Sequence, residues 1–199
     1  MRFCACLFFI IFLLLVGCGV NSTLLFTEAD IEDSINLLQN PGFTPPSLIA
    51  DSSPPGWDIH GVSQSMISQI FQIDPMNVYE GDSSLKINAS KNEIKIVSEP
   101  FRVRRYGGYY ARVMIQSDCH NPPPVTFQMV TFKEDGKITN TFSKKEHISK
   151  DWSRMNVSAG FLRPGVAWGR ISIIIPPFDE GSIWIDDAGC WEVHGFRID

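Results

Sequence analysis

Short runs of alternating apolar and polar residues, each ended by Gly, Pro, Asn or Asp, follow one another from Ile35 to Val193. Because successive side chains point to opposite faces of a β-strand, such runs predict strands with one buried face. We expect about ten strands on this basis: Ile35–Gln39, Ser65–Ile73, Ser84–Ala89, Glu93–Ser98, Gly108–Ser117, Val125–Lys133, Ile138–Ser143, Trp152–Ser158, Trp168–Ile175 and Ser182–Val193. No convincing amphipathic helix interrupts them. The spacing predicts a single all-β domain, built as a sandwich or jelly roll.

The first residues predict export rather than a part of the fold. Arg2 precedes the apolar run Leu7–Val16, which is too short for a comfortable membrane span and is typical of a signal peptide. The run ends in Leu15-Val16-Gly17-Cys18, which resembles the bacterial lipobox. That resemblance implies cleavage before Cys18 and acylation of its thiol, with palmitate among the acyl chains. An ordinary secretory signal that ends near a Cys is the alternative.

This start divides the chain into a lipoprotein signal peptide (1–17), a lipidated polar tether (18–33) and a β-sandwich domain (34–199). Acyl chains on Cys18 would anchor the domain, because each buried CH₂ contributes about 0.8 kcal/mol. The predicted location is the bacterial cell envelope, outside the cytoplasm, on the periplasmic face or the cell surface.

Five Cys are present, and three of them have no place in the expected domain. Cys4 and Cys6 leave with the signal peptide, and Cys18 carries lipid. Cys119 and Cys190 remain, and in an exported protein such a pair is a candidate disulfide. Two buried free thiols are the alternative.

The charge balance excludes one class of partner. The chain has 17 Lys and Arg against 22 Asp and Glu, a net charge of −5 at pH 7. Binding to nucleic acid calls for a basic face. We therefore expect no nucleic-acid partner.

Several short motifs, in their order along the chain, resemble the carbohydrate-binding modules of the family 4 and family 9 type. They are Ile35–Phe43 (INLLQNPGF), Pro55-Gly56-Trp57, Glu80–Ile87 (EGDSSLKI), Gly108-Tyr109-Tyr110, Asp151–Arg154 (DWSR) and Gly181–Gly189 (GSIWIDDAG). The resemblance implies a jelly-roll β-sandwich of the galactose-binding-domain-like type. It also implies binding of a polysaccharide or other glycan without cleavage.

The non-core sides of the expected strands hold side chains that suit sugars. An aromatic ring stacks on the apolar face of a pyranose, and planar Arg and Gln groups reach its hydroxyls. The resemblance implies one cleft on the concave sheet, lined by Tyr110, Arg112, Gln128, Trp168 and Arg170. His60 stands where these modules often place a flanking aromatic. The alternative is that all six are ordinary residues of a solvated outer face.

Two adjacent acids in the last apolar strand, Asp186 and Asp187, predict that one carboxylate points inward and needs a partner. The resemblance implies a structural calcium held by an acid of this strand and by an acid after the opening Gly-Phe turn. Thr44 occupies that second position here. The alternative is an inward Asp that accepts backbone N–H groups of the opening turn. No other cofactor is expected.

Catalysis has little support in the sequence. The four His show no metal-ligand spacing, and no Gly-x-Ser-x-Gly motif occurs. A jelly-roll polysaccharide lyase would need a Tyr, Arg and His set, for which Tyr110, Arg112 and His60 are the candidates; an accessory role to a hydrolase is a related possibility. A further alternative is a scaffold module that binds an envelope protein.

Overall fold

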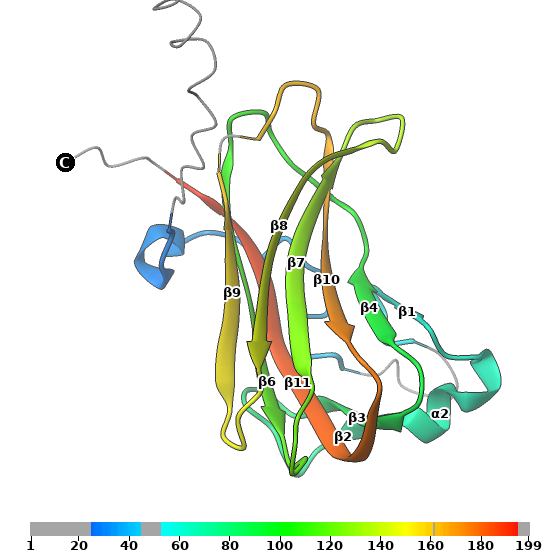
Figure 1. Ribbon diagram of the computed structural model, residues 1–199. Helices are drawn as coiled ribbons and strands as arrows, with labels where there is room; N and C mark the ends of the chain where they lie inside the picture. The colour runs from blue at the N-terminus through cyan, green and yellow to red at the C-terminus, as the bar shows by residue number, and fades with distance from the viewer. Residues whose placement is uncertain (1–24, 45–52, 161, 195–199) are drawn as a thin grey trace, which may run out of the picture.

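The computed structural model describes residues 25–44, 53–160 and 162–194, which form two antiparallel β-sheets packed face to face (Figure 1). The strands of this part of the chain are β1 (Trp57–His60), β2 (Phe71–Asp74), β3 (Ser84–Ser90), β4 (Ile94–Ser98), β5 (Phe101–Arg102), β6 (Gly108–Ser117), β7 (Pro124–Phe132), β8 (Ile138–His147), β9 (Ser153–Ala159), β10 (Trp168–Ile175) and β11 (Phe178–Val193). Three short helices accompany them: η1 (Glu28–Ile31), η2 (Gln64–Met66) and α2 (Ile67–Ile70). The structure confirms the expected all-β jelly-roll sandwich.

Each sheet combines strands that lie far apart in the sequence. In the first sheet, here called sheet A, the order is β1-β4-β10-β7-β8, and β5 also pairs with β10. In the second, sheet B, the order is β2-β3-β11-β6-β9. Such crossovers between the two layers bring residues from the middle and the end of the chain onto one surface.

The core lies between the sheets and follows the predicted alternation. In β10, Ile171, Ile173 and Ile175 are fully buried, whereas Trp168 and Arg170 on the opposite side are partly exposed. Each fully buried side chain of this size contributes about 1.5–3 kcal/mol relative to an exposed one. Parity along the strand therefore predicts correctly which side chains point outward.

One predicted strand is wrong, and a second is only partly correct. Ile35–Gln39 forms no strand; it runs beside β11, where the Leu37 N–H donates to the Cys190 carbonyl and the Asn36 side chain bonds the backbone of β11. An Asn side chain thus replaces part of a regular ladder. The first part of Ser65–Ile73 forms η2 and α2, and β2 supplies the strand only from Phe71. The strands β1 and β5 are too short to show an alternating pattern and were not anticipated.

Residues 26–34, here called the N-terminal strap, pack on the outer face of sheet B. Phe26 and Ile31 contact Tyr110, Trp191 and Val193, and η1 lies beside β9 and the end of β11 (Figure 1). Part of the segment predicted as a lipidated tether (18–33) therefore packs against the sandwich. The predicted signal peptide (1–17) and Cys18 lie outside the described residues. Within the part of the chain that is described, no helix has the length and apolar character needed to cross a membrane.

Cys119 and Cys190 are both buried free thiols, so the predicted disulfide is wrong. Cys190 pairs with Ala111 near one end of β6, whereas Cys119 follows Ser117 at the other end. About 20 Å of strand separates them, far more than the roughly 7 Å between Cα atoms that a disulfide allows. Burial raises the pKa of both thiols and keeps them protonated.

Candidate functional site

The structure divides the six predicted sugar-binding residues between two surfaces. Gln128, Trp168 and Arg170 lie on the outer face of sheet A, and His60 lies on β1 of the same sheet. Two further residues, Tyr110 and Arg112, lie on β6 in sheet B. The prediction of one cleft lined by all of them is wrong. Alternation distinguishes outward from inward side chains, but it does not say to which sheet a strand belongs.

Trp168 is the aromatic group of the sheet A face, and its neighbours fix its position. The indole Nε1 donates to Glu134 Oε2 at 2.9 Å, and the Arg102 guanidinium lies over one face of the ring, 3.6 Å from its centroid. Arg102 also pairs with Glu134. The three side chains come from β10, β5 and the β7–β8 turn. They hold the indole in one orientation and leave only its second face for a ligand.

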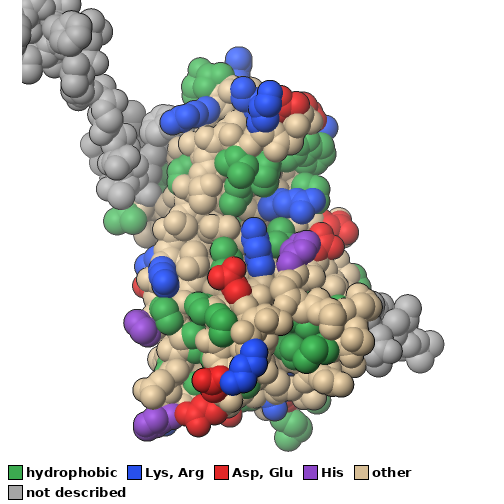
Figure 2. All heavy atoms as spheres, turned by 45° about the vertical axis from the view of Figure 1, so that its right-hand side comes forward, with side chains coloured by type: hydrophobic (Ala, Val, Ile, Leu, Met, Phe, Trp, Pro, Cys, Tyr) green, Lys and Arg blue, Asp and Glu red, His purple; other side chains and the backbone are tan. Residues whose placement is uncertain are grey.

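A shallow hollow of about 330 Å³ opens beside Trp168. Pro100, Phe132 and the indole supply apolar walls, and Lys133 and Arg170 supply cationic groups. Figure 2 shows Lys and Arg side chains gathered at one end of the molecule, next to hydrophobic ones. Bonding to Arg102 and to the Trp168 N–H lowers the pKa of Glu134, so its carboxylate stays charged at mildly acid pH.

The face continues from the hollow across the neighbouring strands. Gln128 pairs with Ser172, which is 2 % exposed, on one side and with the exposed Ser143 on the other, and all three strands belong to sheet A. At the far edge, Asp58 and His60 are exposed on β1. The surface therefore offers the Gln128 amide and the Ser143 hydroxyl on one side, and the buried Ser172 and Val97 separate them from Asp58 and His60 on the other. Such a layout suits an extended ligand with many hydroxyls.

On sheet B, the predicted residues are covered by the chain itself. Glu28 of the N-terminal strap accepts hydrogen bonds from Arg112 Nη1 at 2.8 Å, from Arg154 Nη1 at 2.8 Å and from the Tyr110 hydroxyl at 3.1 Å. Arg112 Nη2 also pairs with Asp187 at 2.7 Å. Tyr110 is almost fully buried, and burial raises its pKa. In this structure neither Tyr110 nor Arg112 is available to a sugar.

The acids of the last strand depart from simple alternation at a β-bulge. Asp186 pairs with Met114 and Gly189 with Arg112, so one extra residue of β11 lies between these two positions. Asp187 has a φ of 43° and turns toward Arg112. Asp186 is fully buried, and its carboxylate accepts the backbone N–H groups of Tyr79, Glu80 and Asp187. Burial raises the pKa of both carboxyls.

These contacts do not favour the predicted calcium site. The donors that satisfy Asp186 come from the loop at Tyr79 and from its own strand, and the backbone of Thr44 bonds the Asn40 side chain. Calcium prefers six to eight oxygen ligands, several of them carboxylates. Among the described residues, no group of three or more His, Cys, Asp or Glu is arranged to hold a metal ion. A calcium bound by Asp186, Asp187 and Thr44 stays a prediction.

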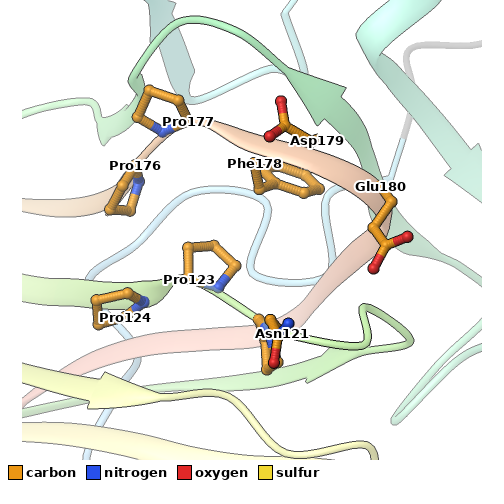
Figure 3. Close-up of a pocket in the computed structure, with 9 residues that line it drawn as sticks. Asn121, Pro123, Pro124, Pro176, Pro177, Phe178, Asp179 and Glu180 are labelled. Atoms are coloured by element: carbon orange, nitrogen blue, oxygen red, sulfur yellow. The ribbon is translucent and has the colours of Figure 1, made fainter.

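A second and larger hollow, of about 700 Å³, lies between the β6–β7 connection and the β10–β11 turn (Figure 3). Prolines form most of its wall, and Asn121, Asp179 and Glu180 stand at its rim. Phe178 also lines it but is 7 % exposed, so no aromatic face is presented. Proline has no backbone N–H to donate to a hydroxyl. The hollow beside Trp168 is therefore the better candidate site.

The sequence analysis missed the residues that leave the face of sheet A open to a ligand and cover the face of sheet B. Glu134 and Arg102, which fix Trp168, lie in a turn and in a two-residue strand, where acids and bases are common. Glu28 falls in the stretch predicted as tether. A Thr-x-x-Asp pattern at Thr27 and Asp30, which forms the capping box of η1, was the available signal that this stretch is ordered.

Comparisons with known proteins agree on the fold. No protein-family model and no curated protein matches the chain. The solved structure of TmCBM61 in complex with β-1,4-galactotriose matches with a TM-score of 0.55 at 14 % identity, over 79 % of this chain and 99 % of that one. A structure described as CBM4 structure and function matches with a TM-score of 0.52 at 14 % identity, over 78 % of this chain and 99 % of that one.

An enzyme also contains a domain of this shape. The enzymatically active domain of tailspike protein 4 from bacteriophage CBA120 matches with a TM-score of 0.60 at 9 % identity. The match covers 80 % of this chain but only 22 % of the tailspike chain. Identities this low establish a shared β-sandwich fold and leave the function to be argued from the residues.

Proposed function

We propose that this protein binds a polysaccharide or oligosaccharide on the outer face of sheet A and does not cleave it. The observation that carries the proposal is the partly exposed Trp168, whose orientation is fixed by Glu134 and Arg102 beside a hollow that Arg170 lines. A fixed indole offers one apolar face to a sugar ring, at a small cost in conformational entropy. The guanidinium and amide groups nearby supply donors for hydroxyls.

The comparisons support this proposal because modules with this fold, TmCBM61 among them, hold sugars. The proposed binding residues are Trp168, Arg170, Gln128 and, at the far edge, His60. The assignment to the family 4 or family 9 type rests on the motifs alone and is part of the proposal.

We further propose that the domain is displayed at the bacterial cell envelope through a lipid on Cys18. The support is the Leu15–Cys18 pattern at the end of an apolar leader. A glycan-binding domain held in this way would capture or retain glycans at the membrane surface, and an envelope protein is a second possible partner.

The three residues proposed for a polysaccharide lyase lie on different sheets. Tyr110 and Arg112 lie on sheet B beneath the N-terminal strap, and His60 lies on sheet A. A general base and its partners must lie within hydrogen-bond reach of one substrate. The set of Tyr110, Arg112 and His60 that a lyase would need is therefore not assembled.

The test is affinity electrophoresis and calorimetry of the protein against a panel of neutral polysaccharides that includes β-1,4-galactan. We expect binding by the wild type, and at least a tenfold loss in both Trp168→Ala and Arg170→Ala. Tyr79→Ala is the matched control, because Tyr79 is an aromatic residue with 47 % exposure on the sheet B side, and its ring is tilted by 59° against that of Trp152.

Equal binding by Trp168→Ala and the wild type would exclude the sheet A face as the site. Failure of the wild type to bind any glycan would favour the envelope-protein scaffold. Release of unsaturated sugars during the incubation would show a lyase and contradict the non-catalytic assignment.

A further inference from the structure

The outer face of sheet B holds a built site for a carboxylate, and Glu28 fills it. Arg112 on β6 and Arg154 on β9 each place a guanidinium nitrogen 2.8 Å from a different Glu28 oxygen. The Tyr110 hydroxyl donates to the same carboxylate and accepts from Asn156 Nδ2 at 3.1 Å. Two guanidinium groups and a phenol directed at one carboxylate are an arrangement typical of anion recognition.

Two of the groups beneath Glu28, Arg112 and Tyr110, are also held by contacts that do not involve it. Arg112 is held from the other side by Asp187 and lies 5.1 Å from the ring centroid of Trp191. Its buried Nε has no hydrogen-bond partner among the described residues, which leaves one donor for a further oxygen. Arg112 and Tyr110 would therefore keep their positions if the N-terminal strap moved away.

An aromatic platform lies next to this anion site. Trp191 extends flat across the sheet because Gly189 has no side chain; a Cβ there would stand 1.8 Å from the indole. The ring centroids of Tyr110 and Trp191 are 6.4 Å apart, and the planes are tilted by only 31°. Phe26 and Ile31 of the strap cover these rings. Removal of the strap would expose two aromatic faces beside the two guanidinium groups.

Side chains, rather than a strand ladder, attach most of the strap to the body of the protein. The strap joins neither sheet, and its contacts to them include the Phe26 N–H to Ser158 Oγ and the Ser34 hydroxyl to the Glu192 carbonyl. Segments with few backbone bonds to the body of a protein open at low free-energy cost. Because Glu28 belongs to the same chain, it competes at an effective concentration of about millimolar.

From these contacts we propose that the outer face of sheet B is a second ligand site, for a glycan that contains uronic acid, and that the N-terminal strap closes it. The carboxylate of a uronic acid takes the place of Glu28 between Arg112 and Arg154, and its pyranose ring stacks on Trp191. The site lies on the sheet opposite to Trp168, so it does not depend on the function proposed for sheet A. A polymer with many uronates displaces the strap more readily than a single sugar does.

The first experiment is chemical rescue in Glu28→Ala. Removal of this carboxylate leaves Arg154 without its ion pair to Glu28 and lowers the unfolding temperature. We expect sodium acetate to restore part of that loss, relative to sodium chloride of equal ionic strength, and to have no such effect on the wild type. Glu32→Ala is the control, because Glu32 is an exposed acid of the same strap. Equal responses of Glu28→Ala and Glu32→Ala to acetate would contradict the anion site.

The second experiment measures binding of polygalacturonate and of uncharged β-1,4-galactan by calorimetry. We expect polygalacturonate to bind Glu28→Ala at least tenfold more tightly than it binds the wild type or Glu32→Ala. The gain should vanish in Glu28→Ala/Arg154→Ala and persist in Glu28→Ala/Trp168→Ala, which separates this site from the sheet A face. If Glu28→Ala does not fold, Glu28→Gln replaces it, with a smaller expected gain.

No gain for polygalacturonate, or a gain that survives loss of Arg154, would overturn the proposal. Tighter binding of poly-glutamate but not of polygalacturonate by Glu28→Ala would also overturn it, because the site would then be for acidic peptides.

Discussion

The outer faces of sheet A and sheet B carry similar side chains, yet only one of them is open. Each presents a Trp next to guanidinium groups: Trp168 beside Arg102 and Arg170 on sheet A, and Trp191 beside Arg112 on sheet B. Trp168 is partly exposed, whereas Trp191 is only 9 % exposed beneath the N-terminal strap. Composition of a face therefore does not indicate whether a ligand can reach it.

The segment that carries each carboxylate explains why one face is open and the other is covered. On sheet A, Glu134 comes from an exposed turn and orients Trp168 without covering the surface. On sheet B, Glu28 arrives on a segment that brings Phe26 and Ile31 with it, and these apolar side chains seal the face. One carboxylate prepares a surface for a ligand, and the other occupies the place that a ligand would take.

The largest expected effect separates the two Trp residues by stability. Trp191→Ala should lower the free energy of unfolding by about 3–5 kcal/mol, because it removes a large buried side chain. Trp168→Ala should cost only about 1 kcal/mol, because its ring is partly exposed and mainly loses a cation–π contact. Urea unfolding of both variants measures the difference. Equal losses would show that the two faces are equally buried and would remove the contrast.

Much of this contrast could not be predicted from the sequence, for identifiable reasons. Alternation correctly assigned Trp168, Arg170 and Gln128 to an outer face, because parity is a local property of a strand. The distribution of strands between two sheets depends on long-range pairing, so Tyr110 and Arg112 were grouped with residues of the other sheet.

Long-range strand pairing also explains why the disulfide prediction is wrong and why the geometry of the predicted metal site differs from the expected one. Asp186 and Asp187 were expected to alternate, but a bulge in β11 turns Asp187 toward Arg112. The disulfide was predicted from the number of Cys in the domain, and that number says nothing about the distance between Cys119 and Cys190. The register of β11 on β6 places them far apart.

The next effect concerns Asp186, which lies at the bulge of sheet B. Asp186→Ala should lower the free energy of unfolding by about 2–3 kcal/mol, because three partly buried backbone N–H groups lose their acceptor. Asp58→Ala on sheet A should change it by less than about 0.5 kcal/mol, since Asp58 is exposed. Thermal unfolding with and without millimolar calcium separates a structural from a metal-binding role. A calcium-dependent rise in the wild type that Asp186→Ala abolishes would establish the metal site.

The smallest expected effect is the response of the sheet A face to pH. Hydrogen bonds from Arg102 and Trp168 lower the pKa of Glu134 from its ordinary value of 4.5. Because the pKa in the folded state is depressed, the contact of Glu134 with Arg102 is complete above pH 4.5 and is lost only as the pH falls through the lower, folded value. Glycan binding should therefore be constant from neutral pH to about pH 5 and decline below about pH 4.5.

Glu134→Gln tests the origin of that decline. The amide still accepts from the Trp168 N–H but carries no charge to pair with Arg102. We expect slightly weaker binding at neutral pH and no further loss attributable to this position on acidification, measured by calorimetry between pH 7 and pH 4. A decline already between pH 7 and pH 6, in the wild type and in Glu134→Gln alike, would instead implicate an imidazole. His60, at the far edge of the face, would then be the residue to substitute.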